Sequence, residues 1–241
     1  MRLDIYLHEN GFANSRTDAK QKITEGLVSL NGTVVMKPSF DVVGEVDLSI
    51  AEGTNKYASR GGIKLETAIS EFKFDIEGKL AIDVGASTGG FTDCLLKNGA
   101  KSVISLDSGS GQLVNELRSD SRVFVMENYN ARYINPNDLP FVPELAVMDV
   151  SFISATYIIP SLYECLKDGS DFICLIKPQF EAGKGKVGKG GIVKDEAVRR
   201  AAIEKVRECA IAVGFDCLGV VKSAITGGDG NVEYLAHFKK K

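Results

Sequence analysis

The sequence has few of the residues that build metal sites and disulfides. Of its 241 residues, two are histidine, five are cysteine and none is tryptophan. The cysteines are odd in number and form no Cys-x-x-Cys pair, so we expect reduced thiols, as in a cytoplasmic protein. Because His8 and His237 are the only histidines, a histidine-based zinc site is not expected, and we predict no bound metal.

Long apolar runs are also missing. No stretch approaches the roughly 20 residues that span a bilayer, and the N-terminal Met1-Arg-Leu-Asp-Ile5 does not resemble a signal peptide. We therefore expect neither a membrane protein nor a secreted one. The net charge of −3 argues against a globally basic nucleic-acid binder, so any such binding must use a local patch.

Residues 1–55 have a pattern of their own. Ser15 is placed to cap a helix over 16–25, which Gly26 ends. A hairpin is predicted from strands over 27–30 and 33–36, because Asn31-Gly32 favours a type I′ turn, and another strand is expected over 41–50. These elements predict a small α+β domain. Its helix carries Arg16 and Lys20 on one face with Lys22 nearby. These positive charges suit RNA binding, but such a charged face is also common on helices that are only exposed to solvent.

From residue 57 the pattern changes to alternating helices and strands. A helix is expected to end at Phe72, and another covers 195–213. Apolar strands are predicted over 80–84, 102–106, 123–126, 145–150, 172–176, 217–224 and 232–238. Such strands separated by helices predict an α/β fold with a mostly parallel sheet covered on both faces. No helix separates the last two strands, so the last one is expected to be antiparallel. The predicted boundaries are 1–55, a linker and first helix over 56–79, and the main sheet domain over 80–241.

The most informative segment is Leu80-Ala-Ile-Asp-Val-Gly-Ala-Ser-Thr-Gly-Gly-Phe91. A strand that leads into a glycine-rich turn and a helix N-terminus is typical of nucleotide-like cofactor sites. Asp107 ends the next strand, 22 positions after Gly85, where a doubly wound fold places a carboxylate for ribose hydroxyls. The loop lacks the Gly-x-Gly-x-x-Gly spacing of dinucleotide sites. Asp83 suits an ammonium or sulfonium cation, and S-adenosylmethionine carries both.

Two other motifs suggest different chemistry. Gly85-Ala-Ser-Thr-Gly89 fits the nucleophile elbow of α/β-hydrolases, but the only downstream histidine, His237, lies within a predicted strand. Gly183 to Gly190 nearly matches a P-loop, but Gly190 replaces the hydroxyl residue that binds magnesium. A hydrolase and an NTPase are therefore disfavoured, and we interpret the Lys/Gly loop as a flexible lid or a phosphate-contacting loop.

Seven motifs across nearly the whole chain resemble the TlyA (hemolysin A) family. They are Ser15-Arg16 with Gly26-Leu-Val28 and Asn31-Gly32; Ser59-Arg-Gly-Gly-Ile-Lys-Leu65; Asp83-Val-Gly-Ala-Ser-Thr-Gly-Gly-Phe-Thr-Asp93; Asn130-Ala-Arg132; Met148-Asp-Val-Ser-Phe152; Ile176-Lys-Pro-Gln-Phe-Glu181; and Gly230-Asn-Val-Glu-Tyr-Leu235. The resemblance implies an S-four-type RNA-binding domain joined to a Rossmann-like, FtsJ-like methyltransferase domain. It further implies transfer of a methyl group from S-adenosylmethionine to ribose 2′-hydroxyls of ribosomal RNA.

The resemblance also implies which residues act. The family's catalytic Lys-Asp-Lys-Glu tetrad matches Lys64, Asp149, Lys177 and Glu233, with Lys177 either accepting the hydroxyl proton or holding the alkoxide. The expected cofactor-binding residues are Asp83, Gly85, Ala86, Ser87, Thr88, Gly89, Gly90, Phe91, Asp107, Asn130 and Asp149. The expected RNA-binding residues are Arg2, Ser15, Arg16, Lys20, Lys22, Asn31 and Arg60.

Two segments depart from the family pattern, and each departure concerns a predicted contact. Residues 106–112 lack the expected valine and aromatic residue, which bears on the adenosine pocket, and residues 225–230 replace a loop richer in proline and lysine. The short N-terminus resembles the family form that acts on the large ribosomal subunit only. We therefore expect ribosomal RNA of the large subunit as the partner, with a cytidine as the target, and a cytoplasmic monomer or weak dimer.

Two alternatives come from other classes of protein. A non-catalytic RNA-binding assembly factor is the stronger one, because a domain can retain its cofactor motifs without activity. A secreted cytolysin, as the family's historical name suggests, is disfavoured because there is no signal peptide and no amphipathic basic helix.

Overall fold

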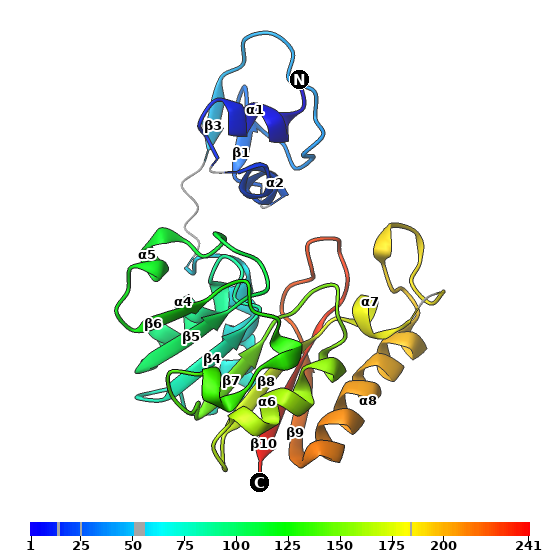
Figure 1. Ribbon diagram of the computed structural model, residues 1–241. Helices are drawn as coiled ribbons and strands as arrows, with labels where there is room; N and C mark the ends of the chain where they lie inside the picture. Colours follow the sequence, from blue (N-terminus) through cyan, green and yellow to red (C-terminus); the bar gives the residue numbers. More distant parts are fainter. Residues whose placement is uncertain (14, 25, 51–55, 184) are drawn as a thin grey trace. The chain divides into compact units, whose positions relative to one another are not determined.

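The computed structural model describes residues 1–13, 15–24, 26–50, 56–183 and 185–241. The chain divides into two units, Met1–Thr54 and Asn55–Lys241 (Figure 1). Each unit has its own hydrophobic core. None of the helices described is long and apolar enough to cross a membrane.

The N-terminal unit packs two helices on a small antiparallel sheet. Helices α1 (Leu3–Glu9) and α2 (Arg16–Thr24) cover strands in the order β2-β1-β3. The strands are β1 (Val28–Leu30), β2 (Thr33–Val34) and β3 (Leu48–Ile50). Ser15 Oγ accepts a 3.1 Å hydrogen bond from the Asp18 N–H, which confirms the predicted cap. Positive φ angles of 49° at Asn31 and 75° at Gly32 confirm the predicted turn.

Parts of the prediction for this unit were wrong. Helix α1 was not predicted, and of the strand expected over 41–50 only β3 forms, while Asp41 makes an isolated bridge to Arg2. The chain leaves the sheet because Gly44 turns it, with φ +74°, and Val43 is 82% exposed. The second hairpin strand ends at Val34, two residues before the predicted end at Met36, although the Val35 N–H still donates to the Val28 carbonyl at 2.9 Å. The predicted helix end at Glu25 lies outside the described residues.

The second unit contains a seven-stranded sheet in the order β6-β5-β4-β7-β8-β10-β9. Its strands are β4 (Leu80–Val84), β5 (Ser102–Leu106), β6 (Val123–Met126), β7 (Leu145–Met148), β8 (Asp171–Ile176), β9 (Phe215–Lys222) and β10 (Tyr234–Lys240). Strands β4 to β8 pair in parallel, whereas β10 runs antiparallel to both of its neighbours. This confirms the predicted, mostly parallel sheet with an antiparallel last strand.

The position of β10 was not predicted, and it matters for the site. The strand lies between β8 and β9, and its register pairs Tyr234 with Ile176. Glu233, just before Tyr234, and Lys177, just after Ile176, therefore leave the sheet at the same edge. The carboxyl ends of the parallel strands lie at this edge too.

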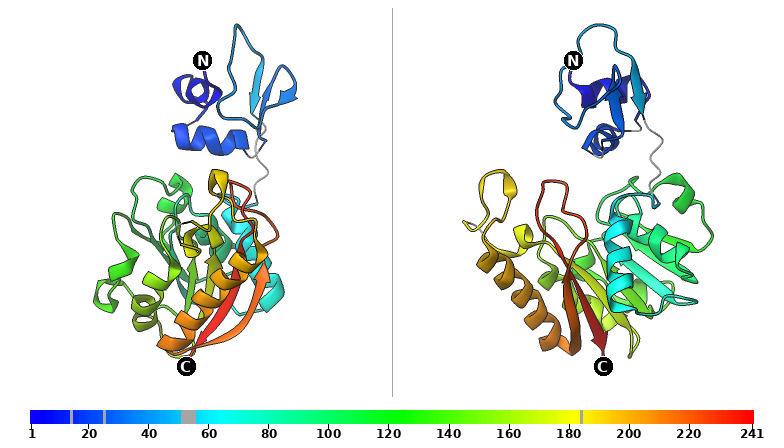
Figure 2. Two further views of the ribbon diagram at one scale, coloured as in Figure 1. Left: turned by 90° about the vertical axis from the view of Figure 1, so that its right-hand side faces the viewer. Right: turned by 180° about the vertical axis from the view of Figure 1, so that it is seen from behind.

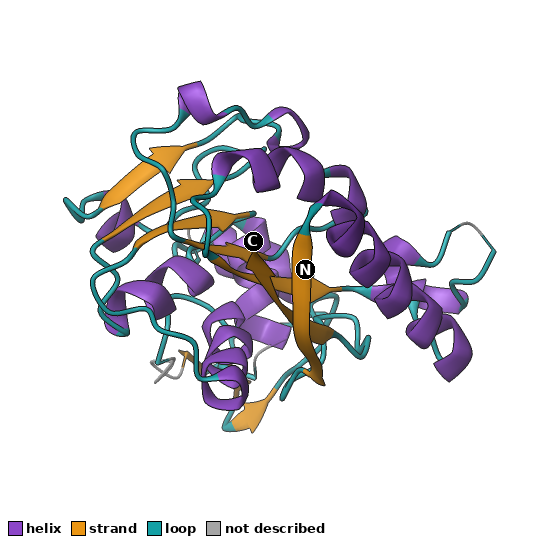
Figure 3. Cartoon of the chain, turned by 90° about the horizontal axis from the view of Figure 1, so that it is seen from below, coloured by secondary structure: helices purple, strands orange, loops and turns teal. Residues whose placement is uncertain are grey.

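Helices cover both faces of the sheet (Figures 2 and 3). Helices α3 (Gly61–Phe72) and α4 (Gly90–Lys97) pack on one face, together with α5 (Asn115–Arg118). Helices α6 (Ile159–Cys165) and α8 (Glu196–Val213) pack on the other face. The short α7 (Pro178–Glu181) directly follows Lys177. Four single 3-10 turns complete the described helices: η1 (Ala131–Tyr133), η2 (Pro136–Asp138), η3 (Ala155–Tyr157) and η4 (Lys189–Gly191).

Candidate active site

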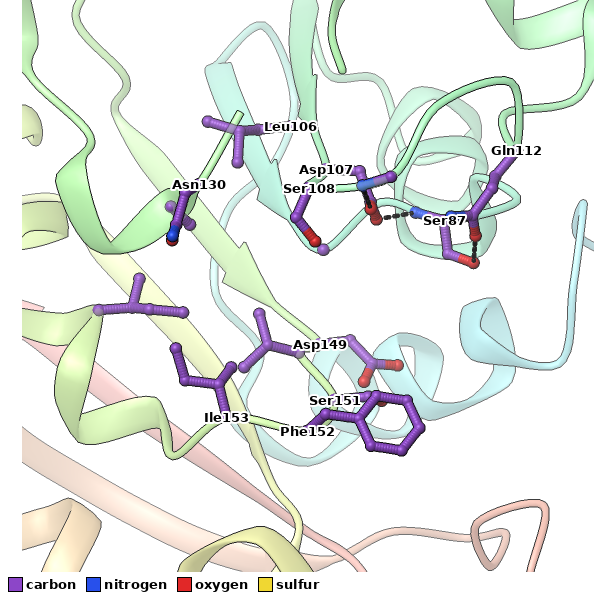
Figure 4. A pocket seen from close by; sticks show the side chains of 15 residues that line it. Ser87, Leu106, Asp107, Ser108, Gln112, Asn130, Asp149, Ser151, Phe152 and Ile153 are labelled. Carbon is purple, nitrogen blue, oxygen red and sulfur yellow. Dashed lines mark hydrogen bonds between the residues drawn. The ribbon is translucent and has the colours of Figure 1, made fainter. Parts of the chain in front are cut away.

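A cavity of about 560 Å³ lies beyond the carboxyl ends of β4, β5 and β7 (Figure 4). Its volume is in the range of small-molecule sites, and ligands of open α/β sheets bind at this edge. Five of the predicted cofactor-binding residues line it: Gly85, Ser87, Asp107, Asn130 and Asp149. Apolar lining comes from Leu106, Val150, Ile153 and Ile158, among others.

Close backbone contacts shape the floor of the cavity at Gly85. The N–H groups of Gly85 and Ala86 donate to the Leu106 carbonyl at 2.8 and 3.1 Å, and the Asp149 N–H donates to the Val84 carbonyl at 3.0 Å. Gly85 has φ +88°, and a Cβ there would lie 2.4 Å from the Asp149 carbonyl oxygen. Only glycine fits this position, because any side chain would push β4 and β7 apart.

Asp107 presents its carboxylate at the cavity wall. One oxygen accepts a 2.8 Å hydrogen bond from the Ser87 N–H, and the other accepts a 2.7 Å bond from the Gly109 N–H (Figure 4). Each carboxylate oxygen can accept a further hydrogen bond, so ribose hydroxyls can bind without displacing the loops. Gln112, which the prediction did not include among the site residues, accepts a hydrogen bond from the Ser87 hydroxyl at 3.1 Å.

Asp83 lies behind the cavity wall and is fully buried. Its Oδ2 accepts a 2.7 Å hydrogen bond from the Thr92 hydroxyl, while its Oδ1 has no hydrogen-bond partner among the residues described. Burial, with a smaller contribution from the charge of Asp149, raises the pKa of Asp83 to about 7. A buried carboxyl group with one unpaired oxygen favours a cation nearby.

Together these groups fit S-adenosylmethionine. Asp83 and Asp149 suit the cationic end, Asp107 suits the ribose hydroxyls, and the apolar lining with the Asn130 amide suits an adenine ring.

The four residues of the predicted tetrad form two ion pairs. Lys64, on α3, and Glu233, just before β10, are both buried, and Lys64 Nζ lies 2.6 Å from Glu233 Oε2. Lys177 Nζ lies 2.6 Å from Asp149 Oδ1 and donates a 2.8 Å hydrogen bond to Ser151 Oγ. Lys177 and Asp149 form a close ion pair, but Asp149 Oδ1 is not aligned to accept a hydrogen bond. The Lys177 amine is therefore held at the edge of the cavity that Asp149 and Ser151 line.

Besides Asp83, five predicted cofactor-binding residues do not line the cavity: Ala86, Thr88, Gly89, Gly90 and Phe91. All except Thr88 are buried. A Cβ on Gly89 would lie 2.3 Å from Leu117 Cδ1, and one on Gly90 would lie 2.3 Å from Ser59 Oγ. These two glycines let α4 pack closely against α5 and the start of α3. The glycine-rich pattern thus serves helix packing as well as the cavity.

Two residues of the cavity wall, Ser151 and Phe152, were not predicted. Ser151 accepts the Lys177 hydrogen bond, and Phe152 lines the cavity while 91% exposed, with its ring 5.3 Å from that of Phe180. Both lie in the Met148–Phe152 motif, which could have indicated them, but only Asp149 of this motif was predicted as a site residue.

The structure does not support a hydrolase, and the Lys/Gly loop follows α7 and not a strand, unlike a P-loop. Ser87 has φ +48°, as a nucleophile elbow would, but its hydroxyl contacts the Gln112 amide. His237 is buried against Phe72 and Phe74 and contacts Asp171, the first residue of β8, at the opposite end of the strands from the cavity. In the Lys/Gly loop, Lys184 lies outside the described residues. All five cysteines are free, and among the described residues no cluster of three His, Cys, Asp or Glu could hold a metal ion.

The predicted RNA-binding side chains are partly committed to contacts within the protein. Arg2 and Arg16 both bind the buried carboxylate of Asp4, at 2.9 and 3.1 Å, and these guanidinium groups hold the pKa of Asp4 at about 2. The other predicted residues lie as follows: Lys22 contacts Asp18 and the Phe12 carbonyl, Asn31 accepts from the Asp47 N–H, Ser15 caps α2, Arg60 donates to the Thr226 carbonyl at 3.4 Å, and Lys20 is exposed.

Comparison with known proteins agrees with both units. Residues 57–240 match the FtsJ-like methyltransferase family, and residues 1–47 match the S4 domain. The 16S/23S rRNA (cytidine-2'-O)-methyltransferase TlyA of Mycobacterium tuberculosis is 40% identical over 97% of this chain and 88% of its own length. The 23S rRNA (cytidine-2'-O)-methyltransferase TlyA of Campylobacter jejuni is 34% identical over the full length of both. A solved structure of a hemolysin-named protein from Streptococcus thermophilus is 42% identical, covers 100% of this chain and 88% of that one, and superposes with a TM-score of 0.80.

Proposed function

The chain belongs to the TlyA family of FtsJ-like methyltransferases, and on this premise we propose that it methylates the ribose 2′-hydroxyl of a cytidine in ribosomal RNA. The methyl donor is S-adenosylmethionine. The observation that carries the proposal is the Lys177–Asp149 ion pair at the wall of the cavity that also holds Asp107.

The residues divide the work as follows. Asp107 binds the cofactor ribose, and Asp83 with Asp149 stabilises the positive charge of the cofactor. S-adenosylmethionine supplies an electrophilic methyl carbon. Once bound, the cofactor would accept the 2′-oxygen at this carbon, and the electron pair of the broken carbon–sulfur bond would stay on sulfur. Lys177 is charged while it pairs with Asp149, so it first releases a proton to solvent; the neutral amine, oriented by Asp149 and Ser151, then receives the hydroxyl proton.

The Lys64–Glu233 pair has a supporting place in this scheme. It is buried, and Glu233 lies at the same sheet edge as Lys177 because of the β8–β10 register. We assign to this pair the role of fixing the position of the 2′-oxygen, because a buried charge pair has little freedom to move.

The proposed substrate is RNA of the large ribosomal subunit. Both relatives named above carry 23S rRNA in their names, and only one also carries 16S. The N-terminal S4 unit supplies the RNA affinity, and the proposed site of action is the cytoplasm, where ribosomal subunits are assembled.

The test is to incubate the purified chain with methyl-labelled S-adenosylmethionine and separate large and small subunits. We expect label in large-subunit RNA, recovered as 2′-O-methylcytidine after digestion to nucleosides, and none with Lys177→Ala. RNA binding without label would instead indicate an assembly factor. Leakage of dye from liposomes without labelled RNA would indicate a lytic protein.

A further inference from the structure

The Lys177 amine lies where two segments that follow neighbouring strands meet. Residues 149–155 follow β7, and residues 177–181 follow β8. They meet first at the cavity, where Lys177 contacts Asp149 and Ser151. The distances from the amine to these two partners therefore depend on how the 149–155 segment is held.

Glu181 makes a second connection between the same segments. It is the last residue of α7 and only 7% exposed. Its Oε1 accepts a 2.7 Å hydrogen bond from the Ala155 N–H, and its Oε2 accepts one from the Ser154 hydroxyl. Lys205, on α8, donates to Glu181 Oε2 at 3.0 Å and to Ser154 Oγ at 3.2 Å. Both carboxylate oxygens are thus bound to the 149–155 segment, and one ammonium group balances the charge.

The residues between these two connections have little packing of their own. Ser151 and Phe152 are exposed, and the ring of Phe152 contacts only Phe180 among the aromatic rings described. Phe152 also has φ +65°, a left-handed conformation that is unfavourable for a residue with a side chain. Such a conformation persists where the surrounding contacts impose it. On the C-terminal side of Phe152, the nearest side-chain hydrogen bonds that join this segment to α7 are those of Ser154 and Ala155 with Glu181.

We propose that Glu181 is a positioning residue, which fixes the 149–155 segment so that Asp149 and Ser151 face the Lys177 amine. Glu181 is absent from the cavity lining, so it acts through this segment and not on a bound ligand. Five consecutive lining residues, 149–153, lie on the segment, so the cofactor site depends on the same connection. The consequence for catalysis rests on the proposed function, whereas the contacts themselves do not.

The test compares Glu181→Gln with Glu204→Gln. Glu204 is an exposed carboxylate on α8 that pairs with Arg207, so it controls for loss of a charge in the same region. In Glu181→Gln we expect faster hydrogen exchange of the 151–156 amides and about tenfold weaker binding of S-adenosylmethionine by calorimetry, the factor for one lost charge-assisted hydrogen bond. Single-turnover methyl transfer at saturating substrates should fall by a similar factor. Glu204→Gln should match the wild type in all three.

A carboxylate that only stabilises the fold would give a different pattern. Its loss would lower the melting temperature. Hydrogen exchange at 151–156, cofactor binding and methyl transfer, all measured well below that temperature, would stay at wild-type values. This result would overturn the proposal. If Glu181→Gln does not fold, Ser154→Ala and Lys205→Met each remove one partner, and each should weaken binding by a few-fold. Wild-type affinity in both would equally overturn it. If the wild type itself bound no S-adenosylmethionine, the proposed function would fail, and the exchange of 151–156 would still decide the role of Glu181.

Discussion

Lys64 and Glu233 are 169 residues apart in the sequence, yet Lys64 Nζ lies 2.6 Å from Glu233 Oε2 in the interior of the protein. The contact joins α3 to the residue before β10, and hence the start of the second unit to its last strand. A buried pair of this kind is costly to break, because removing one partner leaves the other charged and without compensation.

We predict strong coupling between these two side chains in a double-mutant cycle. Lys64→Met and Glu233→Gln should each lower the free energy of unfolding by about 3–5 kcal/mol, while the double variant should lose much less than the sum. Urea denaturation followed by circular dichroism measures all four proteins. Additive losses would show that the pair does not interact. A double variant that regains stability but still transfers no methyl group would separate the pair's role in the reaction from its role in folding.

Much of the second unit could be predicted because its signals are local. The apolar strands and the loop after Val84 placed Asp107 and Gly85 at one sheet edge, and the structure agrees. The insertion of β10 between β8 and β9 could not be predicted, because strand order depends on packing between distant segments. Gly89 and Gly90 look like cofactor residues in the sequence, and only the positions of Leu117 and Ser59 show that they allow helix packing.

The N-terminal unit was less predictable for a different physical reason. Its strands are two or three residues long, too short for alternation to show a period. Asp4 gave no sign of its role, since one of the two guanidinium groups that pair with it comes from Arg16, 12 residues along the chain.

Substitution of Lys177 should abolish the reaction and spare cofactor binding. Lys177→Ala should lose methyl transfer while S-adenosylmethionine affinity stays within a few-fold, because the amine acts mainly on the transition state. Lys177→Arg should fail as well, since a guanidinium group does not accept a proton at neutral pH. Single-turnover assays and calorimetry measure the two effects, with the exposed Lys222→Ala as the control. Substantial transfer by the arginine variant would exclude Lys177 as the proton acceptor.

Cofactor affinity should rise with pH through about 7. Asp83, whose pKa is raised to about 7, is protonated in the free protein below that pH, and only its ionised form attracts a cation. Binding of S-adenosylmethionine at pH 6 should therefore release a proton. Calorimetry in buffers of different ionisation enthalpy measures this release directly. Asp83→Asn should bind weakly at every pH and release none, and equal proton release by this variant would assign the effect to another group.

The same residue should make the fold less stable as pH rises. Unfolded Asp83 ionises near its ordinary pKa of 3.8, whereas the folded protein keeps the proton until about pH 7. The folded state therefore binds more protons between these values, so the free energy of unfolding should fall by up to about 1.4 kcal/mol per pH unit in that window and level off above it. The difference between wild type and Asp83→Asn in urea denaturation at pH 4 to 8 isolates this contribution. A constant difference across the range would contradict the prediction.

Asp107→Asn should weaken S-adenosylmethionine binding more than tenfold. Charge-assisted hydrogen bonds to the ribose hydroxyls are each worth about 1.5–3 kcal/mol, and the asparagine side chain loses the charge. Asparagine is preferable to alanine because its oxygen can still accept one of the N–H groups of Ser87 and Gly109. Asp168→Asn, at an exposed residue, is the control for calorimetry. Wild-type affinity in a folded Asp107→Asn protein would remove this residue from the site.

RNA affinity should come from the N-terminal unit, and Lys20 tests this best. A 2′-hydroxyl is present on every RNA nucleotide, so the catalytic unit alone has little basis for choosing one. Lys20 is exposed on α2, so Lys20→Ala should weaken RNA binding and flatten the slope of log affinity against log salt by about one unit, without changing the stability. Filter binding at several salt concentrations measures the slope, and S-adenosylmethionine affinity should stay unchanged.

Arg16→Ala should behave differently, because Arg16 also binds Asp4. It should weaken RNA binding like Lys20→Ala but also lower the free energy of unfolding of this unit by about 1 kcal/mol, since Arg2 still pairs with the carboxylate. Asp4 has its pKa lowered to about 2, so its ion pairs stabilise the fold above pH 4, and this stability is lost as pH falls toward 2. The acid-dependent loss should be smaller in Arg16→Ala. If a double variant that carries both Arg16→Ala and Lys20→Ala methylates ribosomal RNA at the wild-type rate, with RNA below saturation and at physiological salt, the N-terminal unit is not the RNA anchor, because its two best-placed cations would then contribute nothing to binding.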